Sequence, residues 1–198
     1  RPVKYWNNCY LLRAEEDTRE DWATLSWKAE SCLITGGGIG IDYSVYRPKG
    51  ATIARTGGVA SGPISKMQMI NDVARQVMQG GARRSALYGS LNWEHPDAKE
   101  LLKVKDWGAY PVAGTGMSVG DIRKLDFNFP APLDGTNISL NYDTKWLMDY
   151  YKTNNVGYTF FQNVRMAMKN GEPGFSFNFF DKEKETLRNA LIVSAIIL

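Results

Sequence analysis

The sequence predicts an α/β fold in which at least some strands run parallel. Short apolar or alternating segments of strand length alternate along the chain with longer segments whose apolar residues recur at helical spacing. Glycine clusters and prolines stand at the joints between these segments, where helices end and begin. Alternating strands and helices are typical of parallel sheets, because a helix carries the chain back to the start of the next strand.

In the first half of the chain, the pattern predicts three strands and three helices. The strands cover Asn8–Leu12, Ile39–Ser44 and Ala86–Leu91, and the helices cover Asp17–Leu33, Pro63 to the glycine pair at 80–81, and Pro96–Val104. Asp17 or Thr18 would cap the first helix, and His95 would cap the third. The glycine-rich segments Arg47–Gly62 and Gly108–Gly120 are predicted to be loops.

The second half repeats the alternation. We expect strands at Asn137–Tyr142 and Gly174–Phe180, and helices at Thr144–Lys152 and Thr159–Lys169. Asp181–Ala190 is charged and compatible with a helix.

Composition excludes several classes of function. The 198 residues are 43% hydrophobic and 23% charged, with a net charge of only +3, which predicts no bulk attraction to nucleic acid or to a membrane. No apolar run reaches membrane-spanning length, and the first residues lack the apolar core of a signal peptide. The two cysteines, Cys9 and Cys32, favour a reducing, cytoplasmic compartment. With His95 as the single histidine, no structural zinc site is expected.

Three segments carry candidate binding residues, each with a plain structural alternative. The segment Thr35-Gly-Gly-Gly-Ile-Gly-Ile-Asp42 follows a predicted helix and precedes a predicted strand, which is the reverse of the order in a dinucleotide-binding turn. Its backbone either approaches a ligand closely or ends the helix in a tight turn. Arg47 and Arg55 suit phosphate oxygens, or they belong to a solvated basic loop. Gln79-Gly-Gly-Ala-Arg-Arg-Ser85 either contacts a base or ends a helix. Cys9 is either a redox thiol or an inert small residue, and Cys32 is interpreted as structural.

The order and spacing of these segments resemble the large catalytic subunit of ribonucleotide reductases, most closely the adenosylcobalamin-dependent branch. The resemblance is carried by Asn8-Cys9, the two glycine segments above, Arg47-Pro-Lys-Gly50, Ser61-Gly-Pro-Ile-Ser65, His95-Pro-Asp97, Asn137-Ile-Ser-Leu140, Gly171-Glu-Pro-Gly174 and Leu187-Arg-Asn-Ala190. It implies roughly the first half of a ten-stranded α/β barrel over residues 1–190. Residues 191–198 form an apolar tail that does not match the family.

The resemblance also implies roles for individual residues. Cys9 matches the first cysteine of the redox pair that reduces the ribose 2′ position. The substrate-binding residues would be Asn8, Gly37, Gly38, Arg83 and Arg84. The residues that bind a deoxynucleotide or ATP effector would be Asp17 (or its neighbour Glu16), Arg47 and Arg55. The segment from Gly80 to Ser85 would relay the effector's identity to the substrate base. The implied cofactor is adenosylcobalamin, and the implied reductant is of the thioredoxin type.

The chain also departs from the family pattern. The radical-bearing cysteine, the active-site glutamate and asparagine, and the second redox cysteine are absent from these residues. We therefore expect a fragment that is inactive alone and needs the missing half of the catalytic subunit. The resemblance also implies a homodimer, with a face that the helices at Asp17–Leu33 and Pro63–Met78 help to form. The unpaired strand edges of half a barrel would favour association. A non-catalytic nucleotide-binding module and an inactive remnant remain alternatives.

Overall fold

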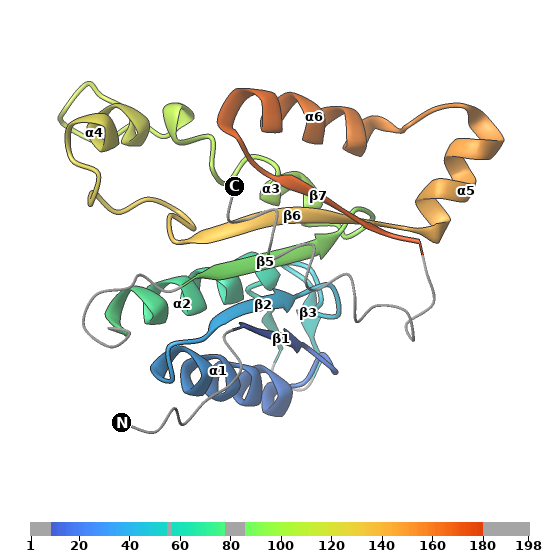
Figure 1. Ribbon diagram of the computed structural model, residues 1–198, viewed down its shortest axis with the longest axis horizontal. Coiled ribbons are helices and arrows are strands. Elements are labelled where there is room, and N and C mark those ends of the chain that lie inside the picture. Colours follow the sequence, from blue (N-terminus) through green and yellow to red (C-terminus); the bar gives the residue numbers. More distant parts are fainter. Residues whose placement is uncertain (1–8, 55–56, 78–85, 180–198) are drawn as a thin grey trace.

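A computed structural model describes residues 9–54, 57–77 and 86–179 of the chain. Its centre is a twisted sheet whose strands lie side by side with their amino ends toward the left in Figure 1. Within these residues the sheet has five strands: β1 (Cys9–Arg13), β2 (Gly38–Asp42), β5 (Leu87–Asn92), β6 (Thr136–Asp143) and β7 (Gly174–Asn178).

The strands lie in the order β1-β2-β5-β6-β7, and every neighbouring pair is parallel. Each connection therefore moves one strand further in the same direction across the sheet. A doubly wound sheet would instead reverse its strand order partway across. The observed order is that of a barrel wall, in which successive parallel strands are neighbours.

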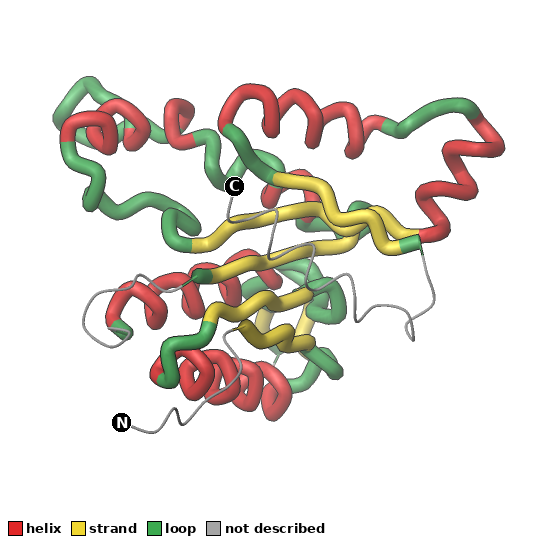
Figure 2. Tube along the Cα trace, viewed as in Figure 1, coloured by secondary structure: helices red, strands yellow, loops and turns green. Residues whose placement is uncertain are grey.

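Seven helical segments connect or follow the strands in the part of the chain that the structure describes. They are α1 (Arg19–Ile34), α2 (Pro63–Gln76), α3 (Ala98–Leu101), the 3-10 turn η1 (Trp107–Ala109), α4 (Val119–Leu125), α5 (Thr144–Thr153) and α6 (Tyr158–Asn170). The helices α1 and α2 lie beside β1, β2 and β5, while α5 and α6 lie beside β6 and β7 (Figure 1). The stretch between α3 and β6 is mostly loop (Figure 2).

One face of the sheet forms the hydrophobic core. Successive strand residues point to opposite faces, and on this face β2, β5 and β6 contribute Ile39, Ile41, Leu87, Leu91, Ile138, Leu140 and Tyr142, all buried. The helices cover it with buried apolar residues of α1 and α2, among them Leu33 and Met67. A Cβ added at Gly89 would lie 3.4 Å from the Met67 sulfur, so α2 packs directly onto this strand.

An aromatic cluster closes the core at the β7 end. Tyr142 of β6 lies edge-on to Trp146 of α5 and Phe160 of α6, with ring centroids 5.2 and 5.1 Å apart. Its hydroxyl donates to the Asn163 side-chain oxygen at 2.9 Å, and the Asn163 amide donates to the Pro173 carbonyl at 2.7 Å. These bonds tie α6 to β6 and to the start of β7.

The predicted elements are present in the described residues, with several corrections to their bounds. The helix expected to reach residues 80–81 ends at Gln76, because Val77 has extended backbone angles. The helix expected over Pro96–Val104 is only the four-residue α3. Its cap residue is Asp97, so the cap predicted at His95 is wrong.

Both predicted loops contain regular structure. Arg47–Gly62 includes a small antiparallel hairpin of β3 (Thr52–Ile53) and β4 (Gly58–Val59). Gly108–Gly120 includes part of η1 and the start of α4, a helix that was not predicted. The helix-compatible stretch Asp181–Ala190 and the tail at 191–198 lie outside the described residues.

Candidate active site on the polar face of the sheet

The face of the sheet opposite the core carries polar side chains across several strands. The parallel register aligns Asp42 with Ser90, Ser90 with Ser139, and Asn141 with Ser176. Ser90, Ser139, Asn141 and Ser176 are buried, and the Asn141 amide donates to the Ser90 hydroxyl at 3.0 Å. A row of hydroxyl and amide groups on one wall of a barrel can hydrogen-bond a polar molecule inside it.

Tyr88 lies on the same face, and its ring covers the glycine backbone of β2. A Cβ added at Gly40 would be 3.4 Å from the Tyr88 ring. Burial raises the pKa of the Tyr88 hydroxyl, and the hydroxyls of Ser139, Ser176 and Ser90 oppose that shift. Tyr88 is therefore a neutral hydrogen-bonding group at neutral pH.

Cys9 stands at the amino end of this face, next to the glycine turn. It is the first residue of β1, its side chain is exposed, and its Cα pairs with that of Gly38. A Cβ on Gly38 would lie 3.2 Å from the Ala86 Cβ and 3.8 Å from the Cys9 sulfur. A Cβ on Gly37 would lie 2.4 Å from the Tyr10 ring, closer than any side chain tolerates. The glycines therefore keep the backbone beside the thiol free of side chains.

Cys32 is set apart from this arrangement by its surroundings. It lies in α1, partly buried, and burial raises the pKa of its thiol. A raised pKa lowers the thiolate fraction, and the thiolate is the reactive form. These features agree with the interpretation of Cys32 as a structural residue.

Two of the expected effector residues contact each other at the other end of the sheet. The Arg47 Nε lies 2.5 Å from Asp17 Oδ2, and its Nη2 donates to the Asp17 carbonyl at 3.1 Å. Arg47 follows the carboxyl end of β2, whereas Gly38 begins that strand. Five residues at about 3.3 Å each separate these ends by roughly 13–16 Å. The thiol and the arginine therefore mark two separate places.

His95 has a structural role in holding the basic loop. Its Nδ1 accepts from the Asp97 backbone N–H at 3.1 Å, so its Nε2 must donate to the Tyr46 carbonyl, 2.8 Å away. The Asp97 carboxylate accepts from the Lys49 backbone N–H at 2.9 Å. The His95-Pro-Asp97 motif thus fixes the loop that begins at Arg47.

The remaining expected site residues, Asn8, Arg55, Arg83 and Arg84, lie outside the described residues. Sequence reasoning did not single out the polar row of Tyr88, Ser90, Ser139 and Ser176. Its signal is the alternation of polar and apolar residues in β5 and β6, which marks a face but not its use.

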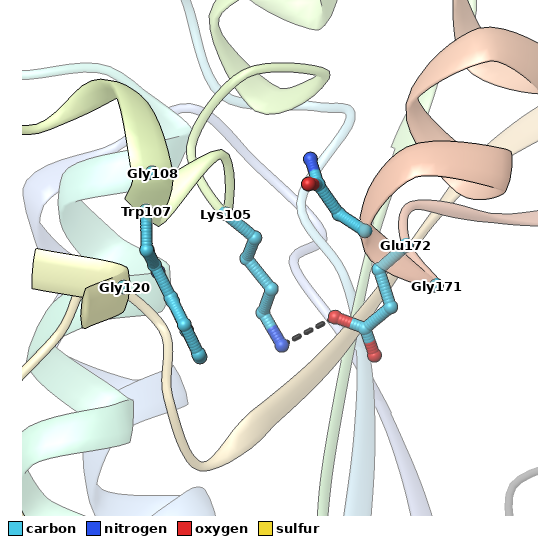
Figure 3. A pocket seen from close by; sticks show the side chains of 7 residues that line it. Lys105, Trp107, Gly108, Gly120, Gly171 and Glu172 are labelled. Atoms are coloured by element: carbon cyan, nitrogen blue, oxygen red, sulfur yellow. Dashed lines mark ion pairs between the residues drawn. The ribbon is translucent and has the colours of Figure 1, made fainter. Parts of the chain in front are cut away.

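A pocket of about 440 Å³ lies near the amino end of β7, lined by residues 105, 107, 108, 120 and 170–172. The Lys105 ammonium and the Glu172 carboxylate form an ion pair across it (Figure 3). Burial raises the pKa of Glu172, and Lys105 opposes that shift. None of the residues predicted for substrate or effector binding lines this pocket.

The strand order and the polar inner face define an α/β protein of the barrel type. A family model described as the ribonucleotide reductase barrel domain matches residues 7–124, more than half of the chain. The chain therefore belongs to the ribonucleotide reductase barrel family, as the resemblance of its motifs predicted.

Individual relatives agree with this assignment. A vitamin B12-dependent ribonucleoside-diphosphate reductase from Thermoplasma acidophilum is 30% identical over 185 residues, which are 91% of this chain and 23% of that protein. A reductase of the same description from Mycobacterium tuberculosis is 36% identical over 112 residues, 57% of this chain and 16% of that protein. The chain thus spans less than a quarter of these relatives.

A solved structure supports the fold. The alpha subunit of a class Id ribonucleotide reductase from Actinobacillus ureae superposes with a TM-score of 0.61 over 86% of this chain and 26% of that subunit, at 14% identity. The predicted α/β fold, part of a ribonucleotide reductase barrel, is confirmed.

Proposed function

We propose that this chain forms one wall of a ribonucleotide reductase active site and supplies Cys9 to its redox pair. The observation that carries the proposal is the exposed Cys9 thiol beside Gly38, at the edge of a sheet face lined with polar groups. Gly37 and Gly38 would offer backbone groups to the ribose of a ribonucleotide substrate. Asn8 would contact the same sugar.

The proposed chemistry is a two-electron reduction. The substrate loses its 2′-hydroxyl as water, while Cys9 and a second thiol together give up two electrons and two hydrogens and become a disulfide. A thioredoxin-type reductant then restores both thiols. The second thiol and the radical-bearing cysteine would come from the remaining part of the catalytic subunit.

Asp17, Arg47 and Arg55 would bind a deoxynucleotide or ATP effector. The Asp17 and Arg47 side chains are each about one-third exposed, at 33% and 37%. Ion pairs this open to solvent contribute less than about 1 kcal/mol. A phosphate could therefore replace Asp17 on the Arg47 guanidinium at little cost. The segment from Gly80 to Ser85, with Arg83 and Arg84 toward the base, would relay the effector's identity to the substrate.

Adenosylcobalamin is the proposed radical cofactor, because the relatives from T. acidophilum and M. tuberculosis are named as vitamin B12-dependent. The residues around the pocket at Lys105 do not fit it, since about 440 Å³ suits a small molecule and a corrin with its nucleotide arm is far larger. No proposed step for Cys9 passes through the cofactor.

The helices α1 and α2 would form the homodimer face. They pack against each other and expose large apolar side chains: Trp27 is 68% exposed, Ile34 63% and Met69 49%. Exposed apolar groups gathered on two adjoining helices favour association.

In the described residues no helix combines the length and apolarity needed to cross a bilayer. We place the protein in the cytoplasm.

The test combines the 198-residue chain with the remaining part of the subunit and measures ribonucleotide reduction with a thioredoxin-type reductant. We expect turnover with the unaltered chain, loss of turnover with Cys9→Ser, and retention with the matched control Cys32→Ser. Full turnover with Cys9→Ser would refute the redox role. Titration calorimetry with deoxynucleoside triphosphates tests the effector site separately: Arg47→Ala should bind at least tenfold more weakly, and the exposed control Arg19→Ala should bind normally.

A further inference from the structure

Tyr46 joins the proposed effector loop to the first turn of α1. Its side chain is buried, and its ring lies against that of Trp22, with centroids 4.9 Å apart. Its hydroxyl donates to the Asp21 Oδ2 at 3.1 Å, and its backbone carbonyl accepts from the His95 Nε2 at 2.8 Å. A residue held at three points leaves little freedom to its neighbour in the chain, Arg47.

Two carboxylates meet at the Tyr46 hydroxyl. Asp17 immediately precedes the cap of α1, and Asp21 lies in the first turn, where its backbone N–H donates to the Thr18 hydroxyl at 3.1 Å. Burial raises the pKa of the Tyr46 hydroxyl, and the charges of Asp21 and Asp17 raise it further. The hydroxyl therefore keeps its proton, and it serves as a donor to a carboxylate, which can only accept.

The available donors divide these carboxylates between them. Arg47 takes Asp17, with its Nε 2.5 Å from the Asp17 Oδ2, and Tyr46 takes Asp21. The Lys66 ammonium of α2 lies close enough to feel the Asp21 charge, but a backbone carbonyl and a hydroxyl of α1 already bind it. Within the described residues the Arg47 guanidinium therefore contacts one carboxylate, that of Asp17.

This division matters for an anionic ligand. A phosphate that binds the Arg47 guanidinium must displace the carboxylate already there, and every further negative charge beside that group opposes it. Without the Tyr46 hydroxyl, the half-buried Asp21 carboxylate would lack its donor and lie beside the same guanidinium. Buried carboxylates seek a hydrogen-bond partner, so Asp21 would compete with the phosphate.

We propose that Tyr46 is a positioning residue of the effector site: its hydroxyl holds the Asp21 carboxylate away from Arg47, so that an incoming phosphate displaces one carboxylate rather than two. This inference rests on the effector site proposed above. Tyr46 itself would not contact the effector.

The experiment is titration calorimetry of the 198-residue chain with deoxyadenosine triphosphate. Tyr46→Phe removes the hydroxyl alone, because the ring and the backbone carbonyl keep their contacts with Trp22 and His95. We expect Tyr46→Phe to bind roughly three- to tenfold more weakly, the scale of one partly exposed, charge-assisted hydrogen bond. The matched control is Tyr151→Phe, at an exposed tyrosine of α5, which should bind normally.

A rescue variant separates this role from a merely structural one. In the Tyr46→Phe background, Asp21→Asn removes the released charge, and binding should return to within about twofold of the unaltered chain. A hydroxyl that only stabilised the fold would predict the opposite, since the second change removes another native contact. Should Tyr46→Phe not fold, Asp21→Asn alone decides: binding at least as tight as that of the unaltered chain is expected, and weaker binding would contradict the inference.

The outcomes distinguish this inference from the effector site itself. Normal binding by Tyr46→Phe, or no recovery in the double variant, would overturn the positioning role even where Arg47→Ala binds weakly. No binding of deoxyadenosine triphosphate by the unaltered chain would refute the effector site, and the role of Tyr46 with it.

Discussion

Lys66 offers the sharpest test of the packing between α1 and α2. Its side chain is fully buried, and its ammonium donates to the Trp22 carbonyl at 2.5 Å and to the Ser26 hydroxyl. It also lies 4.8 Å from the centre of the Trp22 ring. Burial lowers its pKa from 10.5 to about 8, and the Asp21 charge only partly opposes this shift. The fold therefore holds a lysine whose charged form is penalised.

The effect of pH on stability follows from this shift. Between the folded and unfolded pKa values the unfolded chain binds more protons, so the free energy of unfolding rises as pH rises through that range. From pH 7 to 9.5, a shift from 10.5 to about 8 corresponds to a gain of roughly 2 kcal/mol. Burial raises the pKa values of the Tyr43 and Tyr46 hydroxyls. These groups therefore lower the free energy of unfolding only at pH values above this range.

The perturbation is Lys66→Met, which keeps the length of the side chain and removes the charge. Urea unfolding of both proteins across this pH range measures the difference in unfolding free energy. As pH rises, we expect the free energy of unfolding of the unaltered chain to increase by about 2 kcal/mol relative to that of Lys66→Met. A difference that stays constant to within about 0.5 kcal/mol would show that Lys66 is not desolvated as described.

Three further changes probe other parts of the structure. Asn163→Leu should lower the unfolding free energy by about 2–4 kcal/mol, since it leaves the Tyr142 hydroxyl and the Pro173 carbonyl without their partner; an unchanged urea midpoint would contradict this bonding. Gly37→Ala should cost about 1–3 kcal/mol through its clash with the Tyr10 ring, and a neutral effect in the same assay would place that ring elsewhere. Trp27→Glu should reduce self-association in sedimentation velocity, because the Trp27 side chain is 68% exposed on α1, in the proposed homodimer face; unchanged association would mean that this face is not involved.

The sheet strands were predictable because each combines strand length with a clear stop. β6 alternates over eight residues, and β7 follows a turn that contains Gly171 and Pro173. The helix α4 was missed because its seven residues are too short for a periodic pattern. Its capping box between Ser118 and Asp121 was a local signal that could have identified it.

The candidate site was predictable only in part. The sequence motifs identified Cys9, Gly38, Asp17 and Arg47. The structure places these residues as two separate pairs, with Cys9 beside Gly38 and Arg47 against Asp17. The use of the polar row around Tyr88 could not be predicted, because alternation in a strand does not say which face the helices cover. That choice is made by contacts between distant segments, such as Met67 against Gly89.

The most direct test of the account is the redox state of Cys9 after one turnover. The chain is combined with the rest of the subunit and given ribonucleotide without external reductant, and free thiols are then blocked and mapped by mass spectrometry. We predict that Cys9 is found in a disulfide with a cysteine of the other part, while Cys32 remains a free thiol. Recovery of Cys9 as a free thiol after product has formed would contradict the proposed role.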